Sequence, residues 1–460
     1  MKILLINPIT GNISLSSPDL GLGYLAGTLK RENHQVDILD CVNLRLNYEK
    51  FESYVGNLDV DVIGFRVFST DLLSVKKSVK MVREKRPDVK IILGGAHPST
   101  FPEQTLQYFE EADFAIRGEA EKGLTDLITH LSQPDQIAKD QIPGLIWRES
   151  GAIRCNPPLF IENLDALGSP DWDLINPCHY PFQTSYFARS KIVAPLIMTR
   201  GCPYHCTFCS CRAITGHKIR AHSVSYMIHQ IKLLQSRFGI REVCFIDDNF
   251  LARKDLVMEL CEKILAENLD IRWSCFGIRL DLVDEQVLDL MEKSGCYLLT
   301  VGIESGSQRI LDHMKKKLTI ELIEEKIKLI NSKTRINIIG NFIIGYPAEN
   351  EDDIRKTIKF AGKLPLYGAN FFPFHPTPGT EIYERLIAEK KLGPMNWQNM
   401  GQDMKPYVPE GISRQQFTWL FALAFINFYL RPKVIRNVLR ATKSLDKLKY
   451  IAYRIFKIIR

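Results

Sequence analysis

The chain of 460 residues lacks any long hydrophobic run. A membrane-spanning helix needs about 18 to 20 consecutive apolar residues, and the closest stretch, Phe417 to Leu430, has fourteen and contains Asn427. We therefore expect this stretch to be buried or interfacial. The apolar run at the N-terminus ends at Asn7-Pro8, which is too short for a signal peptide and is typical of a first strand.

Low-complexity tracts are also missing, and 45% hydrophobic with 25% charged residues is a globular composition. The eleven cysteines are odd in number and follow no export signal, which argues against a disulfide framework and favours a reducing cytoplasm. Seven cysteines are scattered, and we expect them to act as small buried hydrophobes: Cys41, Cys155, Cys178, Cys244, Cys261, Cys275 and Cys296. A chain of this length is expected to form two or three domains.

The net charge of +7 is unevenly distributed, because residues 431–460 hold ten lysines and arginines against one acid. Wound as a helix, residues 443–460 separate an apolar face from a basic face. A basic amphipathic helix favours peripheral contact with the inner face of the membrane. The alternatives are a helix docked on the protein and an RNA-binding surface. Since no basic-aromatic interleaving accompanies the basic face, we expect no nucleic-acid partner.

Short apolar runs alternate with helix-period stretches up to about residue 125. The predicted strands are Lys2–Ile6, Gln35–Leu39, Val60–Phe65, Lys90–Leu93 and Asp113–Ile116, with helices such as Gly23–Glu32 and Val75–Lys85 between them. This pattern predicts an α/β fold with a doubly wound, Rossmann-like parallel sheet. Ligands of such sheets bind beyond the carboxyl ends of the strands, where the loops Pro8–Gly23, Ser69-Thr70-Asp71 and Gly94–Pro98 fall.

A linker is predicted next, because Gly144–Arg154 has hairpin character and Leu164–Pro177 lacks a helical period. Six further strands are predicted at Ala194–Thr199, Glu242–Asp247, Ile271–Phe276, Leu298–Ile303, Ile336–Ile344 and Asn370–Phe374, with helices between them. Six such units predict a partial (β/α)6 barrel, with its chemistry at the carboxyl ends of the strands. The expected domains are 1–140, a linker at 141–190, the barrel at 191–385 and a helical region at 386–460.

Three cysteines follow the first predicted barrel strand: Cys202, Cys206 and Cys209. A C-x3-C-x2-C run places three thiolates on one tight loop, which can hold three irons of a 4Fe–4S cluster and leave the fourth iron open. Cys211 lies two residues further on and is the alternative fourth ligand.

Polar clusters follow the other barrel strands. Asp247, Asp248 and Asn249 follow the second strand, and carboxylates there suit an ammonium group, although such residues also cap helices. Glu304 and Ser305 follow the fourth strand, where a buried carboxylate needs a partner. Arg279 follows the third strand and can pair with a carboxylate. Gly345-Tyr346-Pro347 follows the fifth strand.

The cysteine loop, with Phe208 before its last cysteine, resembles the signature loop of the radical S-adenosylmethionine superfamily. Gly302–Ser307, Gly345–Glu349 and Pro376–Thr380 are similar to its G-I-E-S-G-S, G-x-P-x-E and P-x-P-G-T runs. The resemblance implies that the open iron binds S-adenosylmethionine and cleaves it to a 5′-deoxyadenosyl radical. The contacts with S-adenosylmethionine that it implies are Phe208, Asp247, Asp248, Asn249, Glu304, Ser305, Gly345 and Pro347.

The N-terminal segment resembles the cobalamin-binding domain that precedes the barrel in one large group of this superfamily. Leu20–Ala26, Gly94–Pro98 and Gly118–Glu121 match its L-G-x-x-Y-L-A, G-G-x-H-P and G-E-x-E runs. The implied cobalamin contacts are Ser69, Thr70, Gly94, Gly95, His97, Gly118 and Glu119. The D-x-H-x-x-G motif of cobalamin mutases is absent, so the resemblance implies no histidine below the cobalt.

The resemblance implies a class B radical methyltransferase that methylates an unactivated carbon of an apolar molecule, such as a lipid, isoprenoid or tetrapyrrole, or of a secondary metabolite. A radical cyclase or rearrangement enzyme is an alternative, and a non-catalytic cobalamin or redox sensor is another. A methylthiotransferase is disfavoured, because only Cys41 precedes residue 155. We expect a cytoplasmic location and an external one-electron donor such as flavodoxin or ferredoxin. No individual catalytic residue is assigned.

Overall fold

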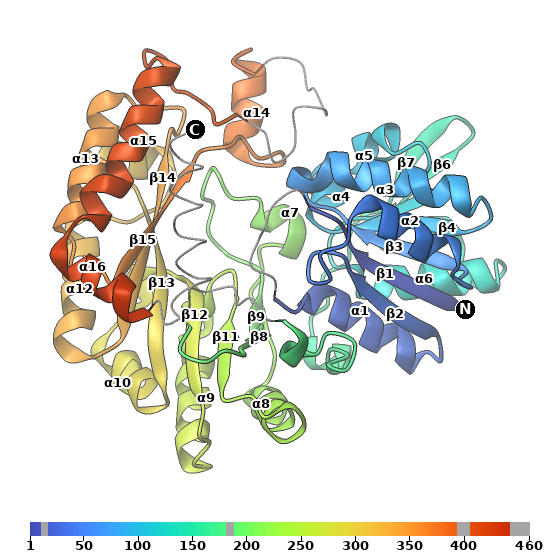
Figure 1. Ribbon diagram of the computed structural model, residues 1–460, viewed down its shortest axis with the longest axis horizontal. Coiled ribbons are helices and arrows are strands. Elements are labelled where there is room, and N and C mark those ends of the chain that lie inside the picture. The colour runs from blue at the N-terminus through green and yellow to red at the C-terminus, as the bar shows by residue number, and fades with distance from the viewer. Residues whose placement is uncertain (11–16, 181–187, 393–404, 442–460) are drawn as a thin grey trace. The chain divides into compact units, whose positions relative to one another are not determined.

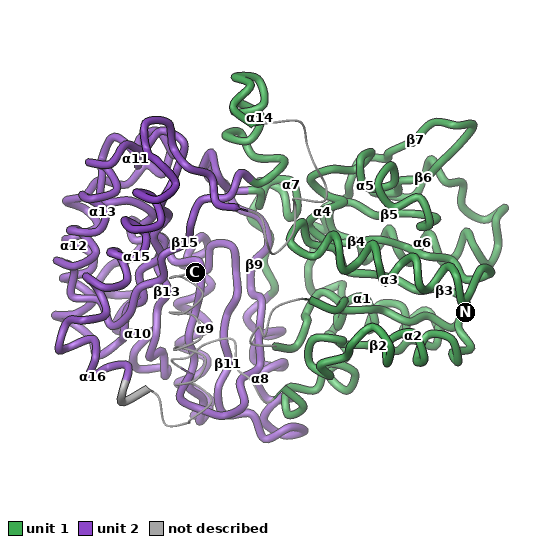
Figure 2. Tube along the Cα trace, turned by 45° about the horizontal axis from the view of Figure 1, so that its top comes forward, with its two compact units in different colours: residues 1–182, 210–222, 377–404 green, residues 183–209, 223–376, 405–460 purple. Residues whose placement is uncertain are grey.

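The computed structural model describes residues 1–10, 17–180, 188–392 and 405–441. The chain divides into two compact units (Figure 2). The first unit consists of residues 1–182, 210–222 and 377–404, and the second of residues 183–209, 223–376 and 405–460. The basic segment 443–460 lies outside the described residues. None of the helices in the described ranges has both the length and the apolar character that a bilayer crossing requires.

The first unit is built on a seven-stranded sheet in the order β2-β1-β3-β4-β5-β6-β7 (Figure 1). Its strands are β1 (Lys2–Asn7), β2 (Gln35–Asp40), β3 (Val62–Arg66), β4 (Lys90–Gly94), β5 (Phe114–Ile116), β6 (Leu145–Glu149) and β7 (Ala152–Cys155). The first five strands are parallel, and β6 and β7 form the predicted antiparallel hairpin. The predicted doubly wound sheet is therefore confirmed.

Alternation along β1 shows how the helices cover both faces of this sheet. Leu4 and Ile6 pack in a core with α2 (Tyr48–Gly56), α3 (Leu72–Lys85) and α5 (Pro102–Tyr108). Ile3 and Leu5 pack in the opposite core with α1 (Leu20–Arg31) and α6 (Ala120–Ser132). A strand with apolar residues on both faces can be buried only between two helical layers.

Two segments that follow the first barrel strand in the sequence belong to the first unit. One contains α7 (Cys211–Thr215) and β10 (Arg220–Ala221), and the other contains α14 (Glu381–Ala388). Tyr383 of α14 lies in the core of the first unit, with its ring centroid 5.8 Å from that of Phe101. The first unit is thus completed by chain that follows the barrel strands.

The second unit has a six-stranded parallel sheet in the order β15-β14-β13-β12-β11-β8. Its strands are β8 (Ala194–Leu196), β11 (Glu242–Phe245), β12 (Arg272–Ile278), β13 (Cys296–Glu304), β14 (Asn337–Ile344) and β15 (Gly368–Pro373), and the short β9 (Thr199–Arg200) follows β8. The helices are α8 (Val224–Phe238), α9 (Lys254–Ala266), α10 (Glu285–Lys293), α11 (Gln308–His313), α12 (Ile320–Lys333) and α13 (Glu351–Lys363). Strands that follow one another in both chain and space form the predicted partial (β/α)6 barrel.

The helices begin where the sequence provides capping side chains. Ser223, Asp284 and Thr319 each accept a backbone N–H of the first turn, and Asn350 forms a capping box with Asp353. Such side chains satisfy N–H groups that have no partner within the helix. Asp19 does the same for α1, which therefore begins at Leu20, before the predicted Gly23.

A helical C-terminal region covers part of the second unit. It consists of α15 (Arg414–Tyr429) and α16 (Pro432–Ala441). Phe428 of α15 is buried against Phe371 of β15, and the Tyr429 hydroxyl donates to the Ala369 carbonyl at 2.6 Å. The apolar stretch 417–430 thus lies in a helix with one buried face, as expected.

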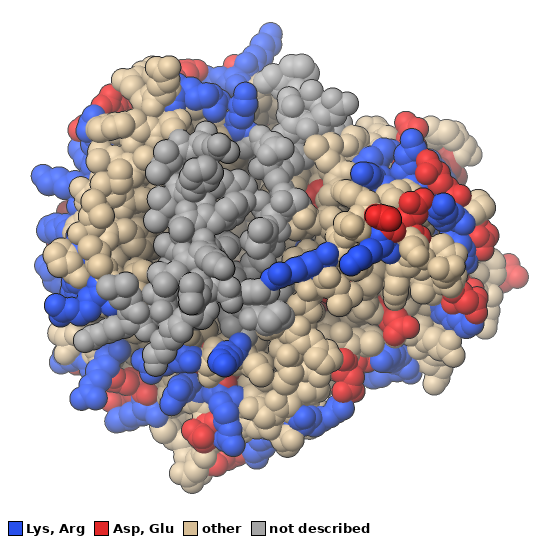
Figure 3. All heavy atoms as spheres, in the orientation of Figure 1, with Lys and Arg blue, Asp and Glu red and all other residues tan. Residues whose placement is uncertain are grey.

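Figure 3 shows the distribution of charge on one face of the protein. On the face in Figure 3, lysine and arginine side chains of the first unit are interspersed with aspartate and glutamate. Seven of the ten lysines and arginines in residues 431–460, namely Arg440 and the six in 443–460, lie outside the described side chains.

Candidate functional site

The three cysteines of the C-x3-C-x2-C run lie on the loop after β9. Cys202 and Cys206 are partly buried and Cys209 is exposed, and none of the three forms a disulfide. Thr207, in the same loop, donates its N–H to the Met314 carbonyl at 3.0 Å. Its hydroxyl lies 2.8 Å from that of the buried Tyr346. The loop is therefore tied to the segments that follow strands β13 and β14.

Within the described residues, no three His, Cys, Asp or Glu side chains stand ready to hold a metal ion. The ligand role of the three cysteines accordingly rests on their spacing. Cys211 begins α7, and its sulfur lies 3.1 Å from the Thr215 hydroxyl. Of the seven scattered cysteines, five are buried as expected, but Cys155 is partly exposed and Cys178 is exposed.

Asp247 is buried at the end of β11, and its carboxylate forms hydrogen bonds with other residues of the protein. Its carboxylate accepts from the N–H of Met198 at 3.1 Å and from the hydroxyl of Thr199 at 2.7 Å, as well as from the Thr199 N–H. Burial raises the pKa of Asp247 to about 7, and these hydrogen bonds oppose the rise. Since Thr199 lies three residues before Cys202, Asp247 holds the strand that leads into the cysteine loop.

The two neighbours of Asp247 differ from it. Asp248 is exposed. Asn249 is 1% exposed, and neither polar atom of its amide has a hydrogen-bond partner among the described residues. A buried amide without partners costs free energy, so Asn249 is ready for a polar ligand. It precedes a short 3-10 helix but makes no capping hydrogen bond with its side chain.

Glu304 ends β13 and forms a buried ion pair with Lys316. Glu304 Oε1 lies 2.8 Å from Lys316 Nζ, and the two residues are 8% and 7% exposed. Gly302 leaves the space for this pair, because a Cβ there would lie 2.4 Å from Glu304 Oε1 and 2.9 Å from Lys316 Nζ. Both atoms end flexible side chains, so a larger residue at position 302 would shift the ion pair.

Two cationic side chains lie beside aromatic rings of the cysteine loop. Arg279 is 5% exposed and lies over the ring of Tyr204, with its guanidinium carbon 3.6 Å from the ring centroid. Lys316 Nζ lies 6.0 Å from the ring centroid of Phe208. Burial raises the pKa of the Cys206 thiol, and Lys316 and then Arg279 oppose that rise. Burial outweighs the two cations, so the pKa of the Cys206 thiol stays above its ordinary value, and Lys316 and Arg279 reduce the cost of a thiolate there.

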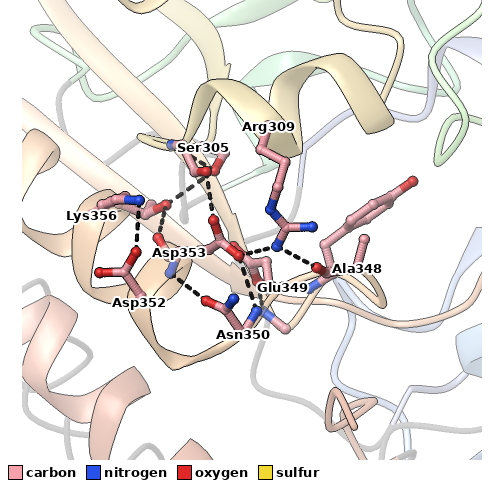
Figure 4. A network of polar contacts seen from close by, with 12 residues as sticks. Ser305, Arg309, Ala348, Glu349, Asn350, Asp352, Asp353 and Lys356 are labelled. Atoms are coloured by element: carbon pink, nitrogen blue, oxygen red, sulfur yellow. Dashed lines mark hydrogen bonds and ion pairs between the residues drawn. The ribbon is translucent and has the colours of Figure 1, made fainter.

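Ser305 and the turn after β14 belong to a connected polar network (Figure 4). The Ser305 hydroxyl lies 3.1 Å from that of Thr357. Asp353 of α13 accepts from the Ser307 hydroxyl at 2.6 Å and is paired with Arg309, which also donates to the Ala348 carbonyl at 2.8 Å. Ser305 therefore anchors the strand end to α13.

The turn at Gly345-Tyr346-Pro347 is shaped by Glu349. The Glu349 carboxyl accepts the N–H of Gly345 at 2.6 Å and that of Tyr346 at 2.9 Å. Burial raises the pKa of Glu349 to about 8, and these two hydrogen bonds oppose the rise. A largely protonated carboxyl thus supports the turn near neutral pH.

In the first unit, the predicted cobalamin contacts lie at the carboxyl ends of β3, β4 and β5. A Cβ on Gly94 would meet nothing within 4 Å, so the end of β4 borders open space. Gly95 has a φ of +106°, which favours glycine. His97 is fully buried with Nδ1 3.0 Å from the Ser69 hydroxyl, and burial lowers its pKa to about 3.

Glu119 is held by other protein groups. Its two carboxylate oxygens each lie 2.7 Å from a guanidinium nitrogen of Arg220, and one also accepts the Ile161 N–H at 3.0 Å. Both side chains of the ion pair are almost fully buried. The pair therefore ties the segment after the cysteine loop to the loop after β5 within the first unit.

Sequence reasoning missed Lys316 and Arg220, and it named Tyr346 only as part of a turn, without a role. Lys316 is the middle residue of three successive lysines, a pattern that normally indicates a solvated surface. Arg220 is about a hundred residues from Glu119 in the sequence, and no spacing links them. The sequence did indicate that a buried Glu304 needs a partner. It did not indicate which residue that partner is.

These features define an iron–sulfur enzyme class in which a cysteine loop on a (β/α)6 barrel accompanies a Rossmann-like cofactor domain. The Radical SAM superfamily matches residues 196–361, and the B12 binding domain matches residues 6–128. An uncharacterized methyltransferase of Pyrococcus horikoshii is 32% identical over 441 residues, covering 95% of this chain and 94% of that protein. The chain belongs to the cobalamin-binding radical S-adenosylmethionine family, and is an enzyme of its methyltransferase type.

Two further comparisons agree with this assignment. The cytidylyl-2-hydroxyethylphosphonate methyltransferase of Streptomyces wedmorensis is 27% identical over 449 residues, covering 85% of this chain and 83% of that protein. The radical S-adenosylmethionine methyltransferase TsrM of Kitasatospora setae has the same fold. The TM-score is 0.70 at 18% identity, with 84% of this chain and 76% of that chain covered.

The family's cofactors are a 4Fe–4S cluster, S-adenosylmethionine and cobalamin, and the residues present fit them. Three cysteines in a C-x3-C-x2-C run suit an iron–sulfur cluster, and Lys316 and Arg279 lie by the rings of Phe208 and Tyr204 in the same loop. The unpartnered amide of Asn249 suits a polar ligand at the carboxyl end of the barrel strands. The open space at Gly94 suits a large flat ligand that approaches the backbone.

Proposed function

We propose that this enzyme transfers a methyl group to an unactivated carbon of a small apolar molecule, such as a tetrapyrrole, an isoprenoid or another lipid. The observation that carries the methyl transfer is the pairing of the cysteine loop with a cobalamin-type sheet in one chain. Exposed apolar side chains at the ends of two barrel strands support the substrate class. Ile246 follows β11 and is 40% exposed, and Phe372 of β15 is 44% exposed.

Relatives that act on tetrapyrroles also support this substrate class. One is a bacteriochlorophyllide d C-8(2)-methyltransferase of Chlorobaculum tepidum, which is 24% identical over 379 residues, covering 79% of this chain. The phosphonate methyltransferase named above acts on a polar substrate, so the experiment below includes both chemistries.

When bound, the cofactors supply the radical and the methyl group, and the protein supplies binding, orientation and exclusion of water. In our assignment Cys202, Cys206 and Cys209 hold the cluster. Asn249 binds S-adenosylmethionine through its buried amide, and Asp248 offers an exposed carboxylate for the ammonium group. Asp247 and Glu349 act indirectly, because their hydrogen bonds position the chain before the cysteine loop and the turn after β14.

The other predicted site residues are likewise divided into those near a cofactor and those that act within the protein. Phe208, Glu304, Ser305, Gly345 and Pro347 form the surroundings of S-adenosylmethionine, and Ser69, Thr70, Gly94, Gly95 and Gly118 form the edge that receives cobalamin. His97 and Glu119 act within the protein, since both already have strong protein partners. An external one-electron donor is required, because none of the assigned residues supplies an electron.

The test is an anaerobic reconstitution with iron and sulfide, followed by hydroxocobalamin, dithionite and S-adenosylmethionine carrying a deuterated methyl group. Apolar and polar lysate fractions are assayed separately. The proposal expects 5′-deoxyadenosine together with a deuterated methyl in an apolar product. 5′-Deoxyadenosine with an unlabelled, rearranged product would instead indicate a cyclase, as in the anaerobic magnesium-protoporphyrin cyclase relatives.

A pair of cysteine variants tests the ligand assignment. Cys206→Ala is expected to lose the cluster absorbance and all 5′-deoxyadenosine formation. Cys211→Ala is the matched control and is expected to retain both. Loss of the cluster in Cys211→Ala would indicate a fourth cysteine ligand and would contradict an open iron.

We also propose that residues 443–460 bring the enzyme to an anionic membrane surface, a role supported by their basic amphipathic sequence. Vesicles of phosphatidylcholine with and without phosphatidylglycerol distinguish charge-dependent binding from non-specific adhesion. Deletion of 443–460 is expected to abolish binding to the anionic vesicles. Unchanged binding by the shortened protein would exclude this role.

A further inference from the structure

A buried lysine lies beside the cysteine loop. Lys316 belongs to the segment between α11 and α12, and its ammonium is paired with Glu304 at 2.8 Å. It also lies near the ring of Phe208, two residues after Cys206. Its two neighbours in the chain, Lys315 and Lys317, are exposed. Only the middle lysine of the three is directed into the protein.

The backbone around this ion pair is strained. Lys315, Lys317 and Glu304 have φ angles of +52°, +55° and +68°. Side chains other than glycine and asparagine rarely adopt this region, and each such residue costs free energy. Three residues with a positive φ lie around this one ion pair. The position of the Lys316 ammonium is therefore maintained at a cost in backbone free energy.

Stability does not explain this arrangement. A buried ion pair is often no more stabilising than apolar residues of the same volume. Arg279 reinforces the placement, because its guanidinium donates to the Lys316 carbonyl at 2.9 Å. Lys316 Nζ lies 6.0 Å from the ring centroid of Phe208 in the cysteine loop, and Met314, two residues before Lys316, accepts the N–H of Thr207 from the same loop at 3.0 Å. The pair is therefore neutral as a whole but presents its positive end to the cysteine loop.

We propose that Lys316 is a positioning residue that sets the reduction potential of the iron–sulfur cluster. This inference rests on the proposed ligand role of Cys206. One electron from the external donor converts the 2+ cluster core to the 1+ core, and no bond forms or breaks. The reduced cluster carries one more negative charge, so a fixed ammonium nearby stabilises it relative to the oxidised cluster. Lys316 makes the cluster easier to reduce.

The experiment is a redox titration of the reconstituted full-length protein, followed by the electron paramagnetic resonance signal of the reduced cluster. Lys316→Met removes the charge and keeps a similar apolar volume. We expect the equilibrium constant for reduction to fall about tenfold, which for one electron is a lower midpoint potential by about 59 mV. Lys317→Met is the matched control, since it makes the same change at an exposed residue with the same backbone strain. Its midpoint is expected to equal that of the unmodified protein.

A second variant keeps the inference testable if Lys316→Met does not fold. The double variant Glu304→Gln/Lys316→Met removes both charges and leaves no unpaired buried carboxylate. Its midpoint is also expected to be lower than that of the unmodified protein, because the ammonium that it removes lies on the side of Phe208 in the cysteine loop.

The outcomes separate this inference from the proposed function. A full cluster with an unchanged midpoint in the Lys316 variants would overturn the inference alone. Failure of the unmodified chain to assemble any cluster would overturn the ligand assignment and, with it, the inference. An equal decrease in the Lys317→Met control would show that the lysine run acts as a general surface charge, and would also overturn it.

Discussion

Three buried carboxyl groups of the second unit are stabilised in three different ways. Glu304 has a cationic partner, and Asp247 accepts hydrogen bonds from the chain before the cysteine loop. Glu349 accepts two backbone N–H groups, and its other oxygen has no partner among the described residues. A buried carboxyl without a cation is most stable in its neutral form, so pH affects these groups differently.

Glu349 provides a test of this difference. Its folded pKa of about 8 lies above the ordinary value of 4.5. The folded protein therefore holds a proton that the unfolded chain releases. This contribution to stability is complete below about pH 4.5 and is lost as the pH rises through 8. Glu349→Gln mimics the neutral form, so its stability relative to the unmodified protein is expected to increase between about pH 5 and pH 8.

The size of that change follows from the shift, because each pKa unit corresponds to about 1.4 kcal/mol. Denaturant unfolding of both proteins at several pH values measures it, and we expect a gain of a few kcal/mol, on the order of the shift. A constant difference in unfolding free energy across this pH range would show that Glu349 is already ionised at low pH in the folded protein.

Asp247 provides a second test, through its hydrogen bonds to Met198 and Thr199. An asparagine at this position has one acceptor oxygen in place of two and would direct its NH2 toward donors. Asp247→Asn is therefore expected to lose about 1–3 kcal/mol of unfolding free energy and to bind less iron after reconstitution. Asp248→Asn, at the exposed neighbour, is the control and should change neither quantity. Equal iron content in both variants would contradict the positioning role of Asp247.

At the residue scale, sequence reasoning identified the buried polar groups better than their partners. The cysteine spacing and the acids after strands β11 and β13 are local patterns, so they are visible without a structure. Lys316 and Tyr346 acquire their roles through contacts between distant segments. The cost of burying Glu304 predicts that a partner exists, but only the fold determines which lysine it is.

At the scale of elements, the segment after the cysteine loop is held by one buried ion pair. Arg220 joins Glu119 through two hydrogen bonds and also donates to the carbonyls of Ile161 and Thr215. Removing one partner of a buried pair leaves an uncompensated charge. This pair therefore contributes more to the placement of α7 and β10 than any surface contact.

Arg220→Met is expected to lower the unfolding free energy by about 3–5 kcal/mol. Lys218→Met is the control two residues away, since its ion pair with Glu162 has side chains 71% and 64% exposed and should contribute less than about 1 kcal/mol. Chemical denaturation of the two variants measures both. Equal losses would show that the buried pair is no stronger than the exposed one.

Most helices and strands were predicted to within a few residues, because apolar periodicity and capping side chains are local. The short helices were not predicted, among them α14 and α7, which has only five residues. The strand predicted over Ala194–Thr199 is divided into β8 and β9. The hydrogen bonds from Met198 and Thr199 to Asp247 explain the interruption, and they depend on a residue about fifty positions away.

At the scale of the whole molecule, the division into two units does not follow the order of the sequence. Residues 210–222 and those that begin at Thr377 belong to the first unit. No periodicity in the sequence indicates that these segments belong to the first unit. Their assignment depends on packing, because Tyr383 lies in the core of that unit. The sequence therefore predicts both folds but not the full extent of each.

Tyr383 tests this membership directly. Tyr383→Ala should cost about 3–5 kcal/mol, as large-to-small changes of buried aromatic residues do. Hydrogen exchange should increase in β1 to β5 while β11 to β15 remain protected. Ile387→Ala, at a residue of the same helix that is 40% exposed, is the control. Increased exchange confined to the second unit would contradict the assignment of α14.

Helix α14 belongs to the first unit but follows the barrel strands in the sequence, which has a consequence for synthesis of the chain. Proteins emerge from the ribosome N-terminus first, so the strands of the first unit are complete long before residue 377 is made. Until then Phe101 and its neighbours lack the Tyr383 side chain that covers them in the finished protein. All six barrel strands are translated during this interval. A nascent chain of this enzyme therefore carries an unfinished N-terminal unit through the synthesis of its entire barrel, which is the period in which a chaperone would be needed.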